Sequence, residues 1–272
     1  MSTARLVIAR TGGLWQKETA ARRAGALIRA RYGERQQVSF KSEVDLVTPV
    51  DREAERLILD TLLGAFPDHG VVAEESTARP ARDGHQWYVD PLDGTTNFAH
   101  GYPHFAVSIA LARQDEFVLG LVYDPLREET FTAVRGAGAR LNGAPIGVSE
   151  TAVLERALVA TGFPHDRRQC GRFYLGFWEA VMTRARDVRR GGSAALDLCY
   201  VACGRLDAFW EWKLHPWDTA AGRLIVEEAG GRVTDFSARP HRLAGDETAA
   251  SNGHLHDDLL RALASADTGA PG

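Results

Sequence analysis

The sequence predicts an α/β (α+β) fold made of two closely packed halves. Two apolar, strand-like runs near the middle of the chain, 105–112 and 117–122, are separated by a short polar segment, which is typical of an antiparallel hairpin. In the second half, short apolar runs alternate with helical segments, as they do in α/β domains. We therefore divide the chain into an N-terminal α+β domain, 1–148, and a C-terminal α/β domain, 149–272.

The first half is expected to begin with helices and to continue with strands. A helix rich in alanine and arginine is predicted at 4–31, and a second helix at 51–65 has its apolar residues at helical spacing. Asn142-Gly143 predicts a tight hairpin turn, because both residues tolerate a positive φ angle. The other strands expected in this half are short: 38–40, 70–73, 87–89 and 130–134.

The second half is expected to alternate strands with helices. The expected strands are 157–161, 188–190, 207–211 and 248–251. The expected helices are 173–185, 193–202, 219–229 and 254–264. Gly230-Gly231 would end the third of these helices, because glycine readily adopts the left-handed conformation that closes many helices.

Composition excludes several classes of protein. The chain has 272 residues, of which 44% are hydrophobic and 25% charged, an ordinary balance for a globular protein. The formal net charge of −4 argues against a global nucleic-acid-binding surface, but leaves room for a local basic patch. The sequence shows no signal peptide at 1–10 and no apolar run of membrane-spanning length. Three cysteines without CxxC spacing fit a reduced compartment, so we expect a cytoplasmic protein without membrane partners.

Five acidic residues lie where a predicted element begins or ends. They are Asp51, Glu74, Asp90, Asp93 and Asp218. Acidic residues at such places often gather at one edge of a sheet, where ligands bind. Carboxylates held close together repel one another, and a hard cation such as Mg²⁺ relieves this repulsion. Because histidine and cysteine are sparse in these motifs, zinc is a weaker candidate.

The segment 90–98 carries the most specific pattern. Asp90 and Asp93 are three residues apart on one turn, where Gly94 permits an unusual backbone angle. If a helix begins there, the amides of Gly94 and Thr95 would bind phosphate oxygens. The alternative is a simple Asp-Gly turn in which an aspartate caps the helix.

Three other acidic positions have structural alternatives as well. Asp51 forms a capping box with Thr48, and Asp218 could be the N-cap of the following helix. Glu74 and Glu75 could be a solvated pair. Each of these positions is ambiguous when it is considered alone.

Taken together, the motifs resemble those of the inositol monophosphatase family. The string 87–98 (WYVDPLDGTTNF) is similar to the family signature, and 45–51 (DLVTPVD) to its upstream motif. The segment 73–76 (AEES) resembles the family's glutamate motif. The segments 216–222 (PWDTAAG) and 228–231 (EAGG) resemble its C-terminal motif. The motifs follow the family order, and the resemblance covers most of the chain.

The resemblance implies a layered α-β-α-β-α sandwich, a homodimer, two to three Mg²⁺ ions per active site and inhibition by Li⁺. The implied metal ligands are Glu74, Asp90, the Leu92 carbonyl, Asp93 and Asp218. Asp51 and Thr95 match the pair that orients and deprotonates the attacking water. Because a threonine hydroxyl is a poor base, the proton would pass through Thr95 to Asp51 or Glu74. The amides of Gly94 and Thr95 match the phosphate-binding groups.

The substrate implied by the resemblance is a small phosphorylated polyol, inositol monophosphate. Glu211 matches a glutamate that binds inositol hydroxyls, and Ser193 and Ala194 match a stretch that lines the same pocket. Asn97-Phe98 fits the inositol phosphatases better than the relatives that act on nucleotide phosphates. Arg189 and Arg190 could face either the substrate or a dimer partner.

Several alternatives stay open at this point. The substrate could instead be histidinol phosphate, fructose 1,6-bisphosphate or an adenosine bisphosphate. Some bacterial members of the family also act on the transcription machinery, so a regulatory role that involves RNA is a further hypothesis. A haloacid-dehalogenase-type phosphatase is disfavoured, because its Asp-x-Asp-Gly-Thr motif is one residue shorter than the spacing from Asp90 to Thr95.

Overall fold

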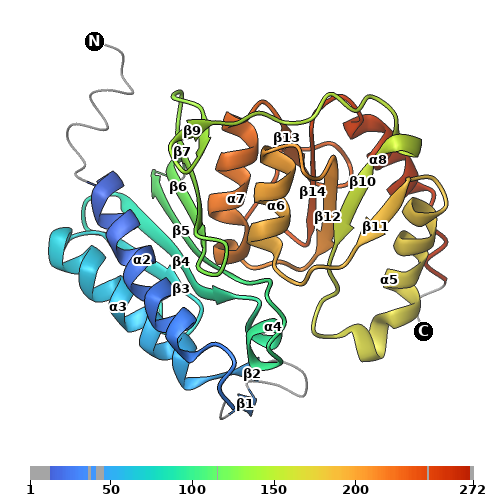
Figure 1. Ribbon diagram of the computed structural model, residues 1–272. Helices are drawn as coiled ribbons and strands as arrows, with labels where there is room; N and C mark the ends of the chain where they lie inside the picture. The colour runs from blue at the N-terminus through green and yellow to red at the C-terminus, as the bar shows by residue number, and fades with distance from the viewer. Residues whose placement is uncertain (1–12, 36–37, 41–45, 115, 244, 270–272) are drawn as a thin grey trace.

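The protein forms five layers in the order α-β-α-β-α, which confirms the predicted fold class (Figure 1). The computed structural model describes residues 13–35, 38–40, 46–114, 116–243 and 245–269. The outer helices of the first half are α2 (Gly13–Arg31) and α3 (Pro49–Ala65). The middle helices are α6 (Ala194–Ala202) and α7 (Pro216–Glu228), and the outer helices of the second half are α5 (Arg167–Met182) and α8 (His256–Ala264).

The larger sheet has seven strands in the order β3-β4-β5-β6-β7-β8-β9. Its first pair, β3 and β4, is parallel, whereas each later pair is antiparallel. The strands are β3 (Gly70–Ala73), β4 (His85–Asp93), β5 (Ala106–Arg113), β6 (Glu116–Asp124), β7 (Glu129–Val134), β8 (Ala139–Leu141) and β9 (Ala144–Pro145). The predicted turn at Asn142-Gly143 joins the last two strands, and both residues have positive φ angles.

The second sheet has five strands in the order β11-β10-β12-β14-β13. They are β10 (Leu158–Thr161), β11 (Asp187–Arg189), β12 (Ala208–Trp212), β13 (Arg232–Thr234) and β14 (Glu247–Ser251). The remaining elements are β1 (Ser39–Phe40), β2 (Leu46–Val47), the 3-10 helix η1 (Leu154–Arg156) and the short helix α4 (Thr95–Ala99). Strands β1 and β2 form a separate two-stranded sheet.

Alternating side chains place the larger sheet between two helical layers. Along β5, Val107 and Ile109 pack in the core beneath α2 and α3, whereas Ala106 and Ala110 face α6 and α7. The small residues on the second face let α7 lie close to the sheet. A Cβ atom at Gly120 would lie only 2.9 Å from the Ala221 carbonyl oxygen, so this contact requires glycine.

The predicted elements are largely present, with several differences at their ends. Helix α5 begins at Arg167 instead of 173, and α7 begins at Pro216 instead of 219. Strand β13 was not predicted, because it is too short to show a periodic pattern. Helix α4 begins at Thr95, where a helix start was considered from the sequence. The part of the predicted first helix that precedes Gly13 lies outside the described residues.

The division at 148/149 stays a prediction. The last strand of the larger sheet ends at Pro145, and the first strand of the second sheet begins at Leu158. However, α6 and α7 belong to one continuous core that includes side chains of both sheets. No helix among the described residues is long and apolar enough to span a membrane.

One feature of α2 is unusual, because Lys17 is fully buried. Its Nζ atom donates a hydrogen bond to the carbonyl oxygen of Gly120, at 2.9 Å. Burial lowers the pKa of the Lys17 ammonium group from 10.5 to about 7. A buried ammonium group loses its hydration, so the position disfavours the charged form.

We predict that Lys17→Met stabilises the protein most at neutral and lower pH. Because the pKa is lower in the folded chain than in the unfolded chain, the cost of burying Lys17 is full below pH 7 and disappears as the pH rises toward 10.5. The variant should gain roughly 1–3 kcal/mol of unfolding free energy at pH 7, since each pKa unit corresponds to about 1.4 kcal/mol. Urea unfolding at pH 6, 7, 8 and 9.5 would measure this gain. Arg52→Met, at an exposed position of α3, is the control. A gain that does not change with pH would contradict the prediction.

Candidate active site

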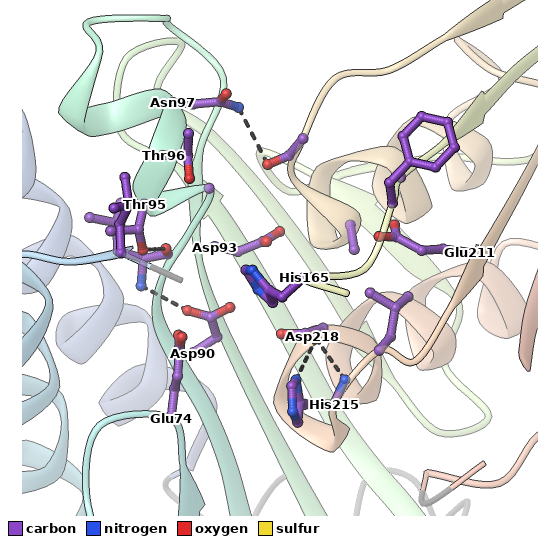
Figure 2. A pocket seen from close by; sticks show the side chains of 18 of the residues that line it. Glu74, Asp90, Asp93, Thr95, Thr96, Asn97, His165, Glu211, His215 and Asp218 are labelled. Carbon is purple, nitrogen blue, oxygen red and sulfur yellow. Dashed lines mark hydrogen bonds and ion pairs between the residues drawn. The ribbon is translucent and has the colours of Figure 1, made fainter. Parts of the chain in front are cut away.

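A cavity of about 440 Å³ opens where α4, the start of α6 and the start of α7 meet (Figure 2). It brings together residues that are far apart in the sequence. The predicted site residues that line it are Glu74, Asp90, Leu92, Asp93, Gly94, Thr95, Ala194, Glu211 and Asp218. Asp51 and Ser193 are buried behind this lining, where they contact Thr95 and Asp93 respectively.

The turn that ends β4 has an irregular backbone. The pairing of β4 with β5 shifts between Asp90 and Asp93, so the strand leaves regular register there. The Asp90 carboxylate stabilises the turn, because its Oδ1 accepts a hydrogen bond from the Leu92 amide at 2.9 Å. Gly94 follows with φ = 101° and is the N-cap of α4. The alternative in which an aspartate caps this helix is therefore wrong.

Glycine is required at position 94 for two reasons. Its left-handed φ angle is unfavourable for other residues. In addition, a Cβ atom there would lie 3.0 Å from the His104 carbonyl oxygen and 3.3 Å from that of Gly192. The Asn97 side-chain amide also donates to the carbonyl oxygens of His104 and Gly191, at 2.7 and 3.0 Å. These contacts hold the turn against the segment that leads into α6.

Parallel pairing brings Glu74 beside Asp90. Strands β3 and β4 pair with Ala73 opposite Val89, so the next residue of each strand is an acidic one. Burial raises the pKa of Asp90 well above its usual range, and the nearby charges of Glu74, Asp93 and Asp218 raise it further. Protonation of this carboxyl group is thus favoured unless a cation compensates for its neighbours.

Asp93 connects the two halves of the chain. Its Oδ2 atom accepts hydrogen bonds from the Ser193 hydroxyl at 2.6 Å and from the Ala195 amide at 2.7 Å, both at the start of α6. Burial and the charge of Asp218 still raise the pKa of Asp93 to about 8. The helix start therefore positions this carboxylate but compensates for only part of its charge.

Asp51 makes the capping contacts and also contacts Thr95, its proposed partner in the site. It is buried at the third position of α3, and its Oδ2 accepts hydrogen bonds from the Thr48 amide and hydroxyl, at 2.8 and 2.6 Å. Its other oxygen, Oδ1, accepts from the Thr95 hydroxyl at 2.7 Å. The capping box is therefore confirmed, and it fixes the carboxylate in an orientation that reaches the cavity wall. Burial raises the pKa of Asp51.

Asp218 also has a structural contact besides its place in the cavity. The N-cap of α7 is His215, so the alternative in which Asp218 is the N-cap is wrong. Asp218 is the third residue of the helix, and its Oδ2 accepts a hydrogen bond from the His215 amide at 2.7 Å. The His215 ring stacks on Trp217, with centroids 4.8 Å apart. As in α3, a helix start orients a carboxylate toward the cavity (Figure 2).

The donor set fits a hard divalent cation. Glu74, Asp90, Asp93 and Asp218 present oxygen atoms, which are the ligands that Mg²⁺ prefers. After burial, neighbouring negative charges contribute to the raised pKa values of Asp90 and Asp93, and a bound cation would neutralise these charges. The carbonyl of Leu92 lies in the same turn, 3.1 Å from the Thr95 hydroxyl.

Glu211 lies on the opposite wall of the cavity, on β12 (Figure 2). Burial raises its pKa well above the usual range, while the nearby Arg190 charge opposes this shift. The Glu211 carboxylate needs the glycine at position 162, where a Cβ atom would lie 2.2 Å from its Oε1. Ala194 lines the cavity as expected, whereas the Ser193 hydroxyl is engaged by Asp93.

Sequence reasoning missed part of the cationic lining. His165, between β10 and α5, and Arg167, the first residue of α5, line the cavity together with Arg190. Of the two arginines that could face the substrate or a dimer partner, Arg190 lines the cavity, whereas Arg189 forms an exposed ion pair with Asp187 at 2.6 Å. Basic residues just after a predicted strand could have indicated His165 and Arg167. However, helix α5 was predicted to start too late to draw attention to them.

Comparison with known proteins gives consistent matches over nearly the whole chain. The model of the inositol monophosphatase family matches residues 14–268. An inositol-1-monophosphatase from Synechocystis sp. is 47% identical over 246 residues, which cover 89% of this chain and 85% of that protein. The Nus factor SuhB of Escherichia coli K12 is 45% identical over 255 residues, which cover 90% of this chain and 96% of that protein. The structure of extragenic suppressor protein suhB from Bartonella henselae has a TM-score of 0.90 at 44% identity, covering 93% of this chain and 98% of that one.

We predict that Asp93→Asn makes the metal-free protein more stable and removes its response to Mg²⁺. Asparagine can still accept the hydrogen bonds of Ser193 and Ala195, but it no longer repels the other carboxylates. In EDTA, Tm should rise by roughly 2–4 °C, which corresponds to about 1 kcal/mol for a chain of this size. Differential scanning fluorimetry with EDTA or with Mg²⁺ measures both effects. Asp60→Asn on α3, whose carboxylate is exposed, is the matched control. A Mg²⁺-dependent Tm increase equal to that of the unmodified protein would refute this assignment.

Proposed function

The chain belongs to the inositol monophosphatase family, and from this premise we propose that it is a Mg²⁺-dependent phosphomonoesterase that hydrolyses myo-inositol 1-phosphate to inositol and phosphate. The observation that carries the proposal is the composition of one cavity. Its one wall holds the carboxylates of Asp90 and Asp93 beside Thr95, and its other wall holds Glu211. Such a cavity can hold a phosphate group on one side and a polyol on the other.

Mg²⁺ ions bound by the carboxylates would polarise the phosphate, promote deprotonation of the attacking water and stabilise the leaving alkoxide. Glu74, Asp90, Asp93, Asp218 and the Leu92 carbonyl are the proposed ligands, for two to three ions. The amides of Gly94 and Thr95 are proposed to bind phosphate oxygens. Gly94, in the αL conformation, is the N-cap of α4. Both amides therefore lie at the start of this helix, which supports the proposal.

The chain's own residues would transfer the proton of the attacking water. The Thr95 hydroxyl donates to Asp51 at 2.7 Å, so its lone pairs remain available to accept a proton from water in the cavity. As the water oxygen forms its bond to phosphorus, its proton would pass to Thr95 and the Thr95 proton to Asp51. The bond between phosphorus and the alcohol oxygen then breaks, and the alcohol leaves with a proton from solvent. Glu74 is the alternative base.

The polyol part of the substrate is proposed to contact Glu211. A carboxylate held in a fixed position accepts hydrogen bonds from hydroxyl groups and discriminates against substrates that lack them. The cavity volume of about 440 Å³ lies in the range of small-molecule sites. Histidinol phosphate, fructose 1,6-bisphosphate and an adenosine bisphosphate are the competing substrates. A cytoplasmic homodimer that is inhibited by Li⁺ remains a prediction from the family resemblance.

A second, regulatory role is favoured by one observation, the similarity to proteins named Nus factor SuhB. We propose that such a role, if the chain has it, uses a surface outside the cavity and does not need the carboxylates. Catalysis and regulation could then be separated by variants at Asp93.

A substrate panel tests the proposed reaction. Phosphate release from inositol 1-phosphate, histidinol phosphate, fructose 1,6-bisphosphate and 3′-phosphoadenosine 5′-phosphate would be measured with Mg²⁺ and with EDTA. We expect activity only with Mg²⁺ and the highest kcat/KM on inositol 1-phosphate. Full activity in EDTA would overturn the metal mechanism, whereas a different preferred substrate would overturn only the assignment of the polyol.

Two variants in the same panel separate chemistry from specificity. Thr95→Ala removes the proposed proton path, so kcat should fall roughly 10²–10⁴-fold on every substrate. Glu211→Gln keeps the shape of the pocket but weakens hydrogen bonds to a polyol, so kcat/KM should fall mainly for inositol 1-phosphate. Thr96, the exposed neighbour of Thr95, also lines the cavity but lies outside the proposed proton path. Thr96→Ala is therefore the control and should change kcat less than about threefold. Equal losses in Thr95→Ala and Thr96→Ala would contradict the role of Thr95.

The regulatory role makes a different prediction for Asp93→Asn. Because the variant loses Mg²⁺-dependent hydrolysis but keeps the fold, it should bind RNA or RNA polymerase as well as the unmodified chain does. Fluorescence anisotropy with labelled RNA and a pull-down with purified polymerase would measure this binding. If the unmodified chain binds neither RNA nor RNA polymerase, the proposed regulatory role is contradicted, whereas the proposed phosphatase activity is not affected.

A further inference from the structure

A second group of metal-ligating side chains lies at the other end of β4 from the active site. It consists of His69, Asp83 and His85, whose ligand atoms all lie within 4.8 Å of one another. We infer that these three side chains form a binding site for a divalent transition-metal ion such as Zn²⁺. This site would be separate from the Mg²⁺ site and would not take part in phosphate-ester hydrolysis.

Strand pairing brings the two histidines together. Because β3 and β4 are parallel with Gly70 opposite Gln86, His69 and His85 occupy the preceding pair of positions. Neighbouring side chains at equivalent positions of paired strands point to the same face of a sheet. The two imidazole rings accordingly stack, with centroids 4.8 Å apart and an angle of 16° between their planes.

A tight turn places the carboxylate between the two rings. Gly84 has φ = 77°, and the Asp83 Oδ1 atom accepts a hydrogen bond from the His85 amide at 3.1 Å. The other oxygen, Oδ2, lies 3.0 Å from Nδ1 of His85 and 3.4 Å from Nε2 of His69. Ligands of one tetrahedral ion with bonds of about 2.05 Å are about 3.3 Å apart. These separations place the Asp83 oxygen within ligand distance of both nitrogens. Because the two rings are stacked, one ring would have to rotate for both nitrogens to face a single ion.

His69 is the most constrained member of the group. The relative accessibility of its side chain is only 10%. Its ring lies between Phe66 and His85, with a centroid distance of 4.7 Å to Phe66. Among the described residues, its buried Nδ1 atom has no hydrogen-bond partner.

The donor types distinguish this site from the active site. Two imidazole nitrogens and one carboxylate oxygen suit Zn²⁺ and related ions, with water as a fourth ligand, whereas Mg²⁺ prefers oxygen ligands alone. At about 3.4 Å per residue, the strand from His85 to Asp90 spans about 17 Å. The two sites are thus too far apart to share an ion. A metal at His69 and His85 would join the end of α3, the turn and the starts of β3 and β4.

Metal titration of the untagged full chain tests this inference. Equilibrium dialysis with Zn²⁺ in excess Mg²⁺ would count bound ions, and Co²⁺ would report the geometry through its visible absorption. We expect His85→Gln and Asp83→Asn each to lose one equivalent of Zn²⁺ and the Co²⁺ absorption of a tetrahedral site. Ions bound at the active site are common to all variants and do not affect this difference. The control His254→Gln, at an exposed histidine, should lose neither.

Activity and stability give independent readouts. Mg²⁺-dependent phosphatase activity in His85→Gln should equal that of the unmodified chain, and Zn²⁺ should raise Tm in the unmodified chain but not in the variant. Equal Zn²⁺ stoichiometry in the unmodified chain, His85→Gln and Asp83→Asn would overturn the inference. A failure to bind Zn²⁺ at this group would leave the proposed hydrolysis of inositol phosphate unaffected, because the panel above tests that reaction separately.

Discussion

Mutual repulsion among buried carboxylates is the constraint on which the active site depends. Asp90 and Asp93 are contributed by the end of β4, and Asp218 is contributed by the start of α7. Their separation in the sequence means that folding itself brings the charges together, and the raised pKa values of Asp90 and Asp93 show the cost. The fold offsets only part of this cost, through the hydrogen bonds that Asp93 accepts from Ser193 and Ala195. The repulsion that remains would favour binding of a hard cation, because the cation's charge relieves it.

Helix starts position much of this site. Asp51 and Asp218 are both the third residue of a helix that begins with proline, and both accept a hydrogen bond from the amide of the N-cap residue. This contact fixes one carboxylate oxygen and directs the other toward the cavity. For both residues, a contact at the third position of a helix is therefore compatible with the role proposed for them in the site. Capping is the means by which a short sequence motif holds a carboxylate in a defined orientation.

The same parallel strand pair organises both ends of β4. At its carboxyl end the register sets Glu74 beside Asp90, and at its amino end it sets His69 beside His85. The sequence alone predicted the first pair, because the acidic residues lie in motifs whose chemistry is recognisable locally. It did not predict the second pair, since neither histidine lies in a motif and their proximity depends on register. Lys17 was missed for the same reason, because its burial results from the packing of α2 against Gly120. Contacts between distant segments were thus predicted only where both residues lie in recognisable motifs, as Asp51 and Thr95 do.

The division between chemistry and specificity follows from which elements form each wall of the cavity. The metal-binding wall is made by strand ends and helix starts that the core holds rigidly, with Thr95 joined to α3 through Asp51. The opposite wall includes His165 and Arg167, which lie outside regular structure or at its edge, and Glu211, whose carboxylate lies against Gly162. A single side chain at position 162 would displace Glu211 without touching the carboxylates. This wall could therefore change without moving the carboxylates, which is the physical reason why the metal chemistry is easier to propose than the substrate.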